Sequence, residues 1–415
     1  MTAGMSQARK RREPQVLRRG MLCTLAAVGA WTVGIAGMAP AAVAADVQSK
    51  QWYLNAMHAE DMWKVTTGAG IKVAVIDSGV NPSTPSLKGQ VLKGLDATGA
   101  KGEATDDYRG HGTTMAELIA GTGNGGGLQG LAPGAKIIPM RISDTEFQNK
   151  QRVNGQDVPD AIRAAADSDA QIISMSSGSE FSSPAGRAAV EYAESKGKLF
   201  FASVGNNAKD GNKEEYPAGY PQVVGVSSAD REGRVAEYSQ HGDNVDIASP
   251  GNDIPYWCDA KFKSYCDGDG GTSAATAVAS ASAALIWSAH PDWTANQVLR
   301  VLFDTAGRDW KKGTRSTYLG HGLIRPGANV IHGKGEPGAA DVNPLTNEKT
   351  SGSSAPSAPA SSQAPKGDSP GQAAVAGSSE KAESDSQLGL ILGGAAVVVL
   401  LAAGTFAVVR RRRSV

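Results

Sequence analysis

The sequence predicts an α/β fold in which helices cover both faces of a mainly parallel β-sheet. Two observations support this prediction. Short runs that are apolar almost throughout recur between residues 71 and 248, which is typical of strands buried on both faces of a parallel sheet. Helical patterns separate several of these runs, and such alternation places helices on both sides of the sheet. In folds of this kind, functional side chains gather beyond the carboxyl ends of the strands.

The apolar runs define the expected strands, at residues 71–76, 136–142, 171–175, 199–204, 223–226 and 245–248. A helix is expected over residues 157–166, and a second over residues 183–196, with Ser183 as its N-cap. A third opens with the capping-box pattern that starts at Thr294 and runs through Ala306. The folded domain that contains these elements is assigned to residues 46–335.

The N-terminus has the pattern of an export signal. Six basic residues lie within residues 1–19, and an uncharged run of apolar and small residues follows over 20–45. This pattern predicts a signal peptide over residues 1–45 that is cleaved near Ala44 or Ala45. The alternative is a retained N-terminal membrane helix, and the export route, general or twin-arginine, stays open.

The C-terminus has the pattern of a membrane anchor. Residues 388–409 form a 22-residue run without charge, long enough to span the hydrocarbon core of a bilayer. Residues 410–415 begin with four arginines, which are expected on the cytoplasmic side. Residues 336–387 are rich in Ser, Ala, Pro and Gly and predict a disordered stalk. The expected protein therefore crosses the cell membrane once and holds its folded domain outside the cell.

Charge and cysteine content exclude several classes of function. The chain has 41 basic and 41 acidic residues, and outside the signal, span and tail it holds 31 basic against 40 acidic residues, so we expect no nucleic-acid partner. Three cysteines exclude a disulfide-dense miniprotein. Cys258 and Cys266 remain after signal removal, and an oxidising compartment favours a disulfide between them, with two free thiols as the alternative.

No cofactor or metal site is expected. The glycine-rich run at residues 121–126 matches the dinucleotide-binding pattern formally, but it follows an expected helix rather than a strand, so we reject it as a cofactor site. The sequence holds no EF-hand calcium pattern. Carboxylates such as Asp106 and Asp107 are expected to be solvated.

Asp77 and His111 are candidates for catalysis. Asp77 directly follows the expected strand 71–76, and a carboxylate placed after a buried strand requires a partner; the alternative is a turn aspartate. His111 lies between Gly110 and Gly112 at the start of an apolar helix, where the glycines allow close approach. A lone histidine is more often structural, so neither residue alone establishes a site.

Ser273 and Asn206 complete the candidate set. Ser273 opens a long helix of small residues, where free N–H groups stabilise an anion, although a serine at this position is usually only a cap. Asn206 follows the expected strand 199–204, and its amide is able to donate to an oxyanion. The alternative is a turn asparagine.

Taken together over residues 50–335, these motifs resemble the subtilisin-like serine peptidases, whose catalytic triad runs in the order Asp, His, Ser. The motifs are Val-Ile-Asp-Ser-Gly-Val at 75–80, Gly-His-Gly-Thr at 110–113, Ser-Met-Ser-Ser-Gly at 174–178, Val-Gly-Asn at 204–206 and Gly-Thr-Ser-Ala at 271–274. The resemblance implies a three-layer subtilisin-like fold.

The same resemblance implies a role for each candidate residue. Ser273 is expected to be the nucleophile, His111 the general base, and Asp77 the group that orients His111. Asn206 and the Ser273 N–H are expected to stabilise the oxyanion. Ser176, Ser177 and Gly178 are expected to line the cleft that binds an extended peptide substrate and seats one of its side chains in a pocket. The motif at 174–178 carries a serine where subtilases commonly have leucine, so their cleft preference does not transfer.

The order of the segments, together with residues 51–54 and 63–70 before the first strand, resembles the mycosins, membrane-anchored subtilases that accompany type VII secretion systems. The implied function is a membrane-anchored extracellular serine endopeptidase with a protein or peptide substrate, associated with type VII secretion. The alternatives are a structural component of a secretion complex in which activity is dispensable, and a general surface protease.

Overall fold

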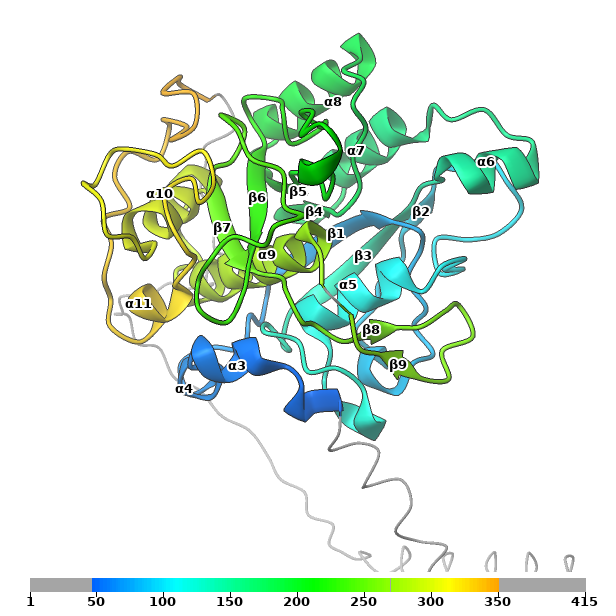
Figure 1. The fold of residues 1–415 in the computed structure, drawn as a ribbon, viewed down its shortest axis with the longest axis horizontal. Coiled ribbons are helices and arrows are strands. Elements are labelled where there is room, and N and C mark those ends of the chain that lie inside the picture. Colours follow the sequence, from blue (N-terminus) through cyan, green and yellow to red (C-terminus); the bar gives the residue numbers. More distant parts are fainter. Residues whose placement is uncertain (1–46, 269, 351–415) are drawn as a thin grey trace, which may run out of the picture. The chain divides into compact units, whose positions relative to one another are not determined.

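The computed structural model describes residues 47–268 and 270–350 (Figure 1). The predicted signal peptide, the span at 388–409, the basic tail and most of the predicted stalk lie outside the described residues. Within the described ranges, no helix has the length and apolarity needed to cross a membrane.

The central sheet is parallel throughout, in the order β2-β3-β1-β4-β5-β6-β7. Its strands are β1 (Lys72–Asp77), β2 (Leu95–Asp96), β3 (Lys136–Arg141), β4 (Ile172–Met175), β5 (Leu199–Ser203), β6 (Val224–Ala229) and β7 (Ile247–Pro250). All six expected strands are present, with ends that shift by up to three residues. The additional strand, β2, has only two residues, too few for an apolar run to indicate it.

Two hydrophobic cores form, one on each face of the sheet, because successive residues of a buried strand point to opposite faces. In β1, Val73 and Val75 belong to the core beneath α5 (His111–Ala120) and α9 (Thr272–Ala289). Ala74 and Ile76 belong to the core beneath α7 (Asp157–Asp167) and α8 (Pro184–Ser195). This arrangement confirms the three-layer α/β prediction, and the same alternation directs Asp77 towards the layer of α5 and α9.

The helix-capping predictions are confirmed. The Ser183 side chain accepts a hydrogen bond from the Gly186 N–H at the start of α8. Thr294 and Gln297 form the expected capping box at the start of α10 (Ala295–Thr305). The shorter helices are α3 (Trp52–Ala56), α4 (Ala59–Trp63), α6 (Thr145–Gln151) and α11 (Pro326–Val330), and the 3₁₀ segments are η1 (Pro85–Leu87), η2 (Asn124–Gly126) and η3 (Ala208–Asp210).

A small antiparallel hairpin, β8 (Tyr256–Trp257) and β9 (Tyr265–Cys266), lies beside α5 (Figure 1). A disulfide joins Cys258 to Cys266, with 5.1 Å between their Cα atoms, as the cysteine count predicted. The hairpin is bonded to the helix, because the Trp257 N–H donates to Thr114 Oγ at 3.0 Å.

The glycine-rich run at 121–126 follows α5, as expected, and it contacts the N-terminal segment of the domain. The Gln48 side-chain amide donates to the carbonyl oxygens of Gly123 at 2.7 Å and Gly127 at 3.0 Å. The loop therefore serves as an attachment point for the N-terminal segment.

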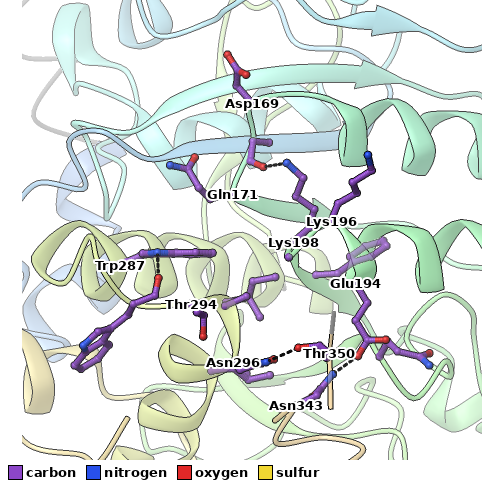
Figure 2. Close-up of a pocket in the computed structure, with 18 residues that line it drawn as sticks. Asp169, Gln171, Glu194, Lys196, Lys198, Trp287, Thr294, Asn296, Asn343 and Thr350 are labelled. Carbon is purple, nitrogen blue, oxygen red and sulfur yellow. Dashed lines mark hydrogen bonds between the residues drawn. The ribbon is translucent and has the colours of Figure 1, made fainter. Parts of the chain in front are cut away.

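The folded domain extends beyond its predicted end at residue 335. Figure 2 shows the reason, because Asn343 donates to the Glu194 carboxylate at 2.6 Å and Asn296 donates to Thr350 Oγ at 2.9 Å. Asn343 is only 5% exposed. The composition of residues 336–350 resembles a linker, but these specific polar contacts fix the segment to α8 and α10, so the boundary at 335 is corrected to at least Thr350.

Candidate active site

The candidate site lies at the carboxyl ends of β1 and β4, where the connections that leave these neighbouring strands run to opposite sides of the sheet. The chain leaves β1 towards β2 and β3 on one side of it, whereas it leaves β4 towards β5 on the other side. Such a divergence opens a crevice at the carboxyl ends of the strands. A cavity of about 200 Å³ lies there, and its lining includes Asp77, His111, Ser176 and Ser177.

Asp77 and His111 are directly hydrogen-bonded. Asp77 Oδ1 lies 2.7 Å from His111 Nδ1 and also accepts from the Ser78 N–H at 2.7 Å. The carboxylate is buried, with 4% of its side chain exposed, whereas the imidazole keeps 38% exposed. Among the described residues Asp77 Oδ2 has no hydrogen-bond partner, so its charge is left for the imidazole to balance.

The glycine after His111 makes this contact possible. A Cβ atom at Gly112 would collide with the carbonyl oxygen of Gly79 and lie 3.0 Å from Asp77 Cβ. The absence of a side chain therefore lets the first turn of α5 approach the end of β1 closely enough for the hydrogen bond.

Electrostatics favour the charged form of His111. Burial disfavours the imidazolium, but the charge of Asp77, its hydrogen bond and the more distant charge of Asp107 together raise the pKa of His111 above its ordinary value. The site thus stabilises the imidazolium that forms when His111 accepts a proton.

Asp107 is buried rather than solvated, which corrects the sequence-based expectation. It is 8% exposed, and its oxygens accept from Ser78 Oγ, from the N–H groups of Arg109, Gly110 and Thr113, and from Thr113 Oγ. It therefore fixes the turn before His111. The signal in the sequence was an aspartate three residues before a glycine that opens a helix, a pattern typical of a capped turn. Asp106, in contrast, is exposed as expected.

Ser273 lies in the first turn of α9, beside the residues that follow β4. Its hydroxyl donates to the carbonyl oxygen of Ser176 at 3.0 Å, and Ser176 Oγ donates to the carbonyl oxygen of Ser273 at 3.2 Å. Ser176 also lines the cavity that contains His111. The structure therefore brings Ser273 to this crevice with its hydroxyl directed at Ser176.

The Asn206 amide has a defined orientation. Its Oδ1 accepts from the N–H of Thr272 at 2.9 Å and from Thr272 Oγ at 3.0 Å. A backbone N–H only donates, so the amide atom that faces it must be the oxygen. Asn206 is exposed, and its Nδ2 has no hydrogen-bond partner among the described residues and lies near Gly271, the residue before α9.

The remaining predicted cleft residue, Gly178, lies slightly farther from the catalytic candidates. It lines a second cavity, of about 420 Å³, together with Ser177, Phe181 and Tyr216. The two cavities share Ser177 and residues 142–144. Ser176, Ser177 and Gly178 thus form one wall that runs from His111 into the second cavity.

Comparisons with known proteins agree with this geometry. The profile of the subtilase family (Peptidase_S8) matches residues 68–323, a range that includes Asp77, His111, Asn206 and Ser273. Thermitase from Thermoactinomyces vulgaris is 30% identical over 65% of this chain and 95% of its own length. A thermophilic serine proteinase of Bacillus sp. (strain AK1) is 37% identical over 46% of this chain, and the match spans only 47% of that protein.

The crystal structure of MycP1 from the ESX-1 type VII secretion system has 26% sequence identity and a TM-score of 0.58, covering 69% of this chain and 87% of that one. The similarity of fold, the length of the family match and the placement of the four motif residues lead to one assignment, with Asp77 and Asn206 at or after strand ends and His111 and Ser273 in the first turns of helices. This chain belongs to the subtilase family of peptidases.

Proposed function

We propose that this subtilase is a membrane-tethered serine endopeptidase that cleaves exported proteins through an acyl-enzyme on Ser273. The observation that carries the proposal is the 2.7 Å contact between Asp77 Oδ1 and His111 Nδ1, in the crevice to which α9 delivers Ser273. This contact leaves Nε2 of His111 as the basic nitrogen, which is the tautomer that a serine nucleophile needs.

Acylation follows from these positions. The Ser273 hydroxyl turns from Ser176 to His111, and Nε2 takes its proton while Oγ bonds to the substrate carbonyl carbon. The carbonyl π electrons move to the oxygen, and the resulting oxyanion accepts hydrogen bonds from Asn206 Nδ2 and the Ser273 N–H, which has no carbonyl partner within the helix. The oxyanion then collapses, the C–N bond breaks, and the leaving amine takes the proton from His111.

Deacylation repeats these steps with water. His111 takes a proton from the water, the hydroxide oxygen bonds to the acyl carbon, and the ester bond to Ser273 breaks as the proton returns to Oγ. The carboxylic acid product leaves and the enzyme is restored. The Asp77 carboxylate stabilises the imidazolium in both halves of the reaction.

The proposed membrane location is supported by the sequence, whereas the proposed association with type VII secretion is supported by structural similarity. The uncharged run at 388–409 and the arginines that follow it support a single-span anchor with the peptidase domain outside the cell. The similarity to MycP1, a protein from the ESX-1 type VII secretion system, supports an association with type VII secretion. We propose that the substrates are proteins exported by such a system.

Labelling with a fluorophosphonate tests the catalytic assignment. The reagent forms a covalent bond to an activated serine, so we expect the purified full-length chain to be labelled and Ser273→Ala to remain unlabelled. Ser280→Ala is a matched control, because Ser280 is a buried serine on the same helix. A native wild-type protein that resists labelling would remove the enzyme assignment.

The oxyanion assignment is tested at Asn206. We expect Asn206→Ala to lower kcat by about 100- to 1000-fold. Asn206→Asp keeps an acceptor for Thr272 but removes the amide donor, so it separates anchoring of α9 from donation to the oxyanion. Full activity in Asn206→Asp would show that the side chain only anchors the helix.

The physiological role is tested in cells. If proteolysis is the essential role, type VII secretion fails in a Ser273→Ala strain as it does in a deletion strain. Normal secretion in the Ser273→Ala strain together with loss in the deletion strain would show that the domain acts as a structural component.

A further inference from the structure

Glu215 is a buried carboxylate that the triad, the oxyanion site and the sequence motifs leave unexplained. The residue is 9% exposed and lies between η3 and β6. Oε1 accepts from the Asn207 side-chain amide at 3.2 Å, while Oε2 has no hydrogen-bond partner and neither oxygen has an ion-pair partner among the described residues. The nearby Lys213 is paired elsewhere, with Glu180 at 2.7 Å.

This environment disfavours an isolated negative charge. Burial and the charge of Glu180 raise the pKa of Glu215, and the hydrogen bond from Asn207 opposes them only in part. A buried carboxylate that lacks a cation costs stability unless a partner arrives. Glu215 therefore has the properties expected of a group that binds a positively charged ligand.

The carboxylate lies between the two strand ends that build the active site. A Cβ atom added to Gly178 would lie 2.7 Å from Glu215 Oε2, and one added to Gly205 would lie 2.7 Å from Oε1. Each oxygen thus contacts the backbone beyond one strand, Gly178 after β4 and Gly205 after β5. Gly178 has no side chain to cover Oε2, whereas the Gln240 side chain lies beside Gly205, next to Oε1.

The same two segments contact the reacting groups. Two residues before Gly178, the Ser176 carbonyl accepts from the Ser273 hydroxyl. Directly after Gly205, Asn206 contacts the start of α9 and offers its amide to the oxyanion. If a substrate carbonyl is held between Ser273 and Asn206, the side chain of its own residue enters the space between these segments, beside the Glu215 carboxylate.

We propose that Glu215 selects a lysine or arginine at the substrate residue whose carbonyl Ser273 attacks. This inference rests on the proposed function, since it assumes the acyl-enzyme on Ser273. Lysine and arginine have long, flexible stems that reach a carboxylate set back from the cleft and end in a positive charge. Pairing satisfies the free Oε2, while a glutamate or aspartate at the same substrate position is repelled.

The test uses the full-length protein and a set of peptides of the form succinyl-Ala-Ala-Pro-Xaa-aminomethylcoumarin, in which Xaa is Lys, Arg, Gln, Met, Phe or Glu. Gln and Met approach Lys in length without its charge. We expect kcat/KM for Lys and Arg to exceed that for Gln and Met by about 10- to 100-fold, as one charged hydrogen bond provides. In the Glu215→Gln variant, we expect the kcat/KM values for the Lys, Arg, Gln and Met peptides to lie within about threefold of one another.

Glu214→Gln is the matched control. Glu214 is the adjacent residue with the same charge, but it is exposed and accepts from the Tyr216 hydroxyl at 2.9 Å. We expect Glu214→Gln to keep the preference for Lys and Arg. Fluorophosphonate labelling of Glu215→Gln at the wild-type rate verifies that this variant is folded and that its triad works.

The outcomes separate this inference from the proposed function. A wild-type enzyme that is labelled and active but prefers Phe or Met, or a Glu215→Gln variant that keeps the preference for Lys and Arg, overturns the role of Glu215 and leaves the peptidase intact. A wild-type protein that neither reacts with the fluorophosphonate nor cleaves any peptide of the set overturns the proposed function and this inference with it.

Discussion

The two helices that supply His111 and Ser273 pack against each other but are held in place by different forces. α9 runs from Thr272 to Ala289; 14 of its 18 residues are Ala, Ser or Thr, and it has no ionisable side chain. α5 runs from His111 to Ala120 and carries both an imidazole and the buried carboxylate of Glu117. Close packing of small side chains thus positions most of α9, with polar contacts near its two ends, whereas buried polar groups help to position α5.

The polar bonds of α5 reach residues from distant parts of the chain. Glu117 accepts from Thr84 Oγ at 2.8 Å and from the Tyr265 hydroxyl at 2.6 Å, while Asp107 fixes the turn before His111. α9, in contrast, contacts β1 and β4–β7 as well as α5, because its small side chains allow close approach. We therefore expect the polar contacts of α5 to depend on pH more strongly than the packing of α9 does.

The largest expected effect tests the polar side of this comparison. Asp77→Asn removes the charge that holds the His111 tautomer, and we expect kcat to fall by about 10,000-fold. Because Asp77 raises the pKa of His111, we also expect the acidic limb of the residual pH–rate profile to move to lower pH. A pH series of kcat/KM measures both effects. Asp106→Asn, at an exposed position, is the control and should be active.

Glu117 provides the next largest expected effect, on stability. Burial raises the pKa of Glu117 to about 7, against the hydrogen bonds from Tyr265 and Thr84. The folded state therefore binds this proton more tightly than the unfolded state, so the contribution to stability is complete below about pH 4.5 and is lost as pH rises through 7. On the order of 3 kcal/mol of unfolding free energy is linked to this proton.

We expect Glu117→Gln to flatten the dependence of stability on pH between about 5 and 8. Denaturant unfolding at pH 5 and pH 8 measures the change in stability. Burial also raises the pKa of Asp246 to about 7. Because Asp246 is present in both proteins, its contribution cancels when the variant is compared with the wild type. Glu146→Gln on the surface of α6 is the control. Parallel pH curves for Glu117→Gln and wild type would contradict the polar description of α5.

The sequence was sufficient for the main elements of the fold because their signals are local. Apolar runs identified the six longer strands of the sheet, and side-chain caps identified the starts of α8 and α10. Strand order was not predictable, since it depends on contacts between distant segments. α6 was missed because its residues Thr145–Gln151 carry no apolar period and bury only Phe147.

The candidate site also contains residues that the sequence predicted and residues that only the structure reveals. The motifs located Asp77, His111, Asn206 and Ser273, and the structure shows the contact that joins the first two. Asp107 and Glu215 were not predicted as functional, because the capped-turn signal of Asp107 went unused and the surroundings of Glu215 come from segments distant in the sequence. Glu215 in particular stands out only when Gly178 and Gly205 are seen on either side of its carboxylate.

The smallest of these effects tests the packing of α9. Ala279 is fully buried in the core beneath the sheet, and we expect Ala279→Leu to lower the free energy of unfolding by about 1–3 kcal/mol, because the added carbons have no space. Ala289→Leu, at the half-buried end of the helix, should cost less. Since α9 has no titratable group, the loss at Ala279 should be equal at pH 5 and pH 8. A loss that changes with pH would mean that overpacking of α9 disturbs Glu117 on α5, and the two helices would then have to be treated as one coupled unit.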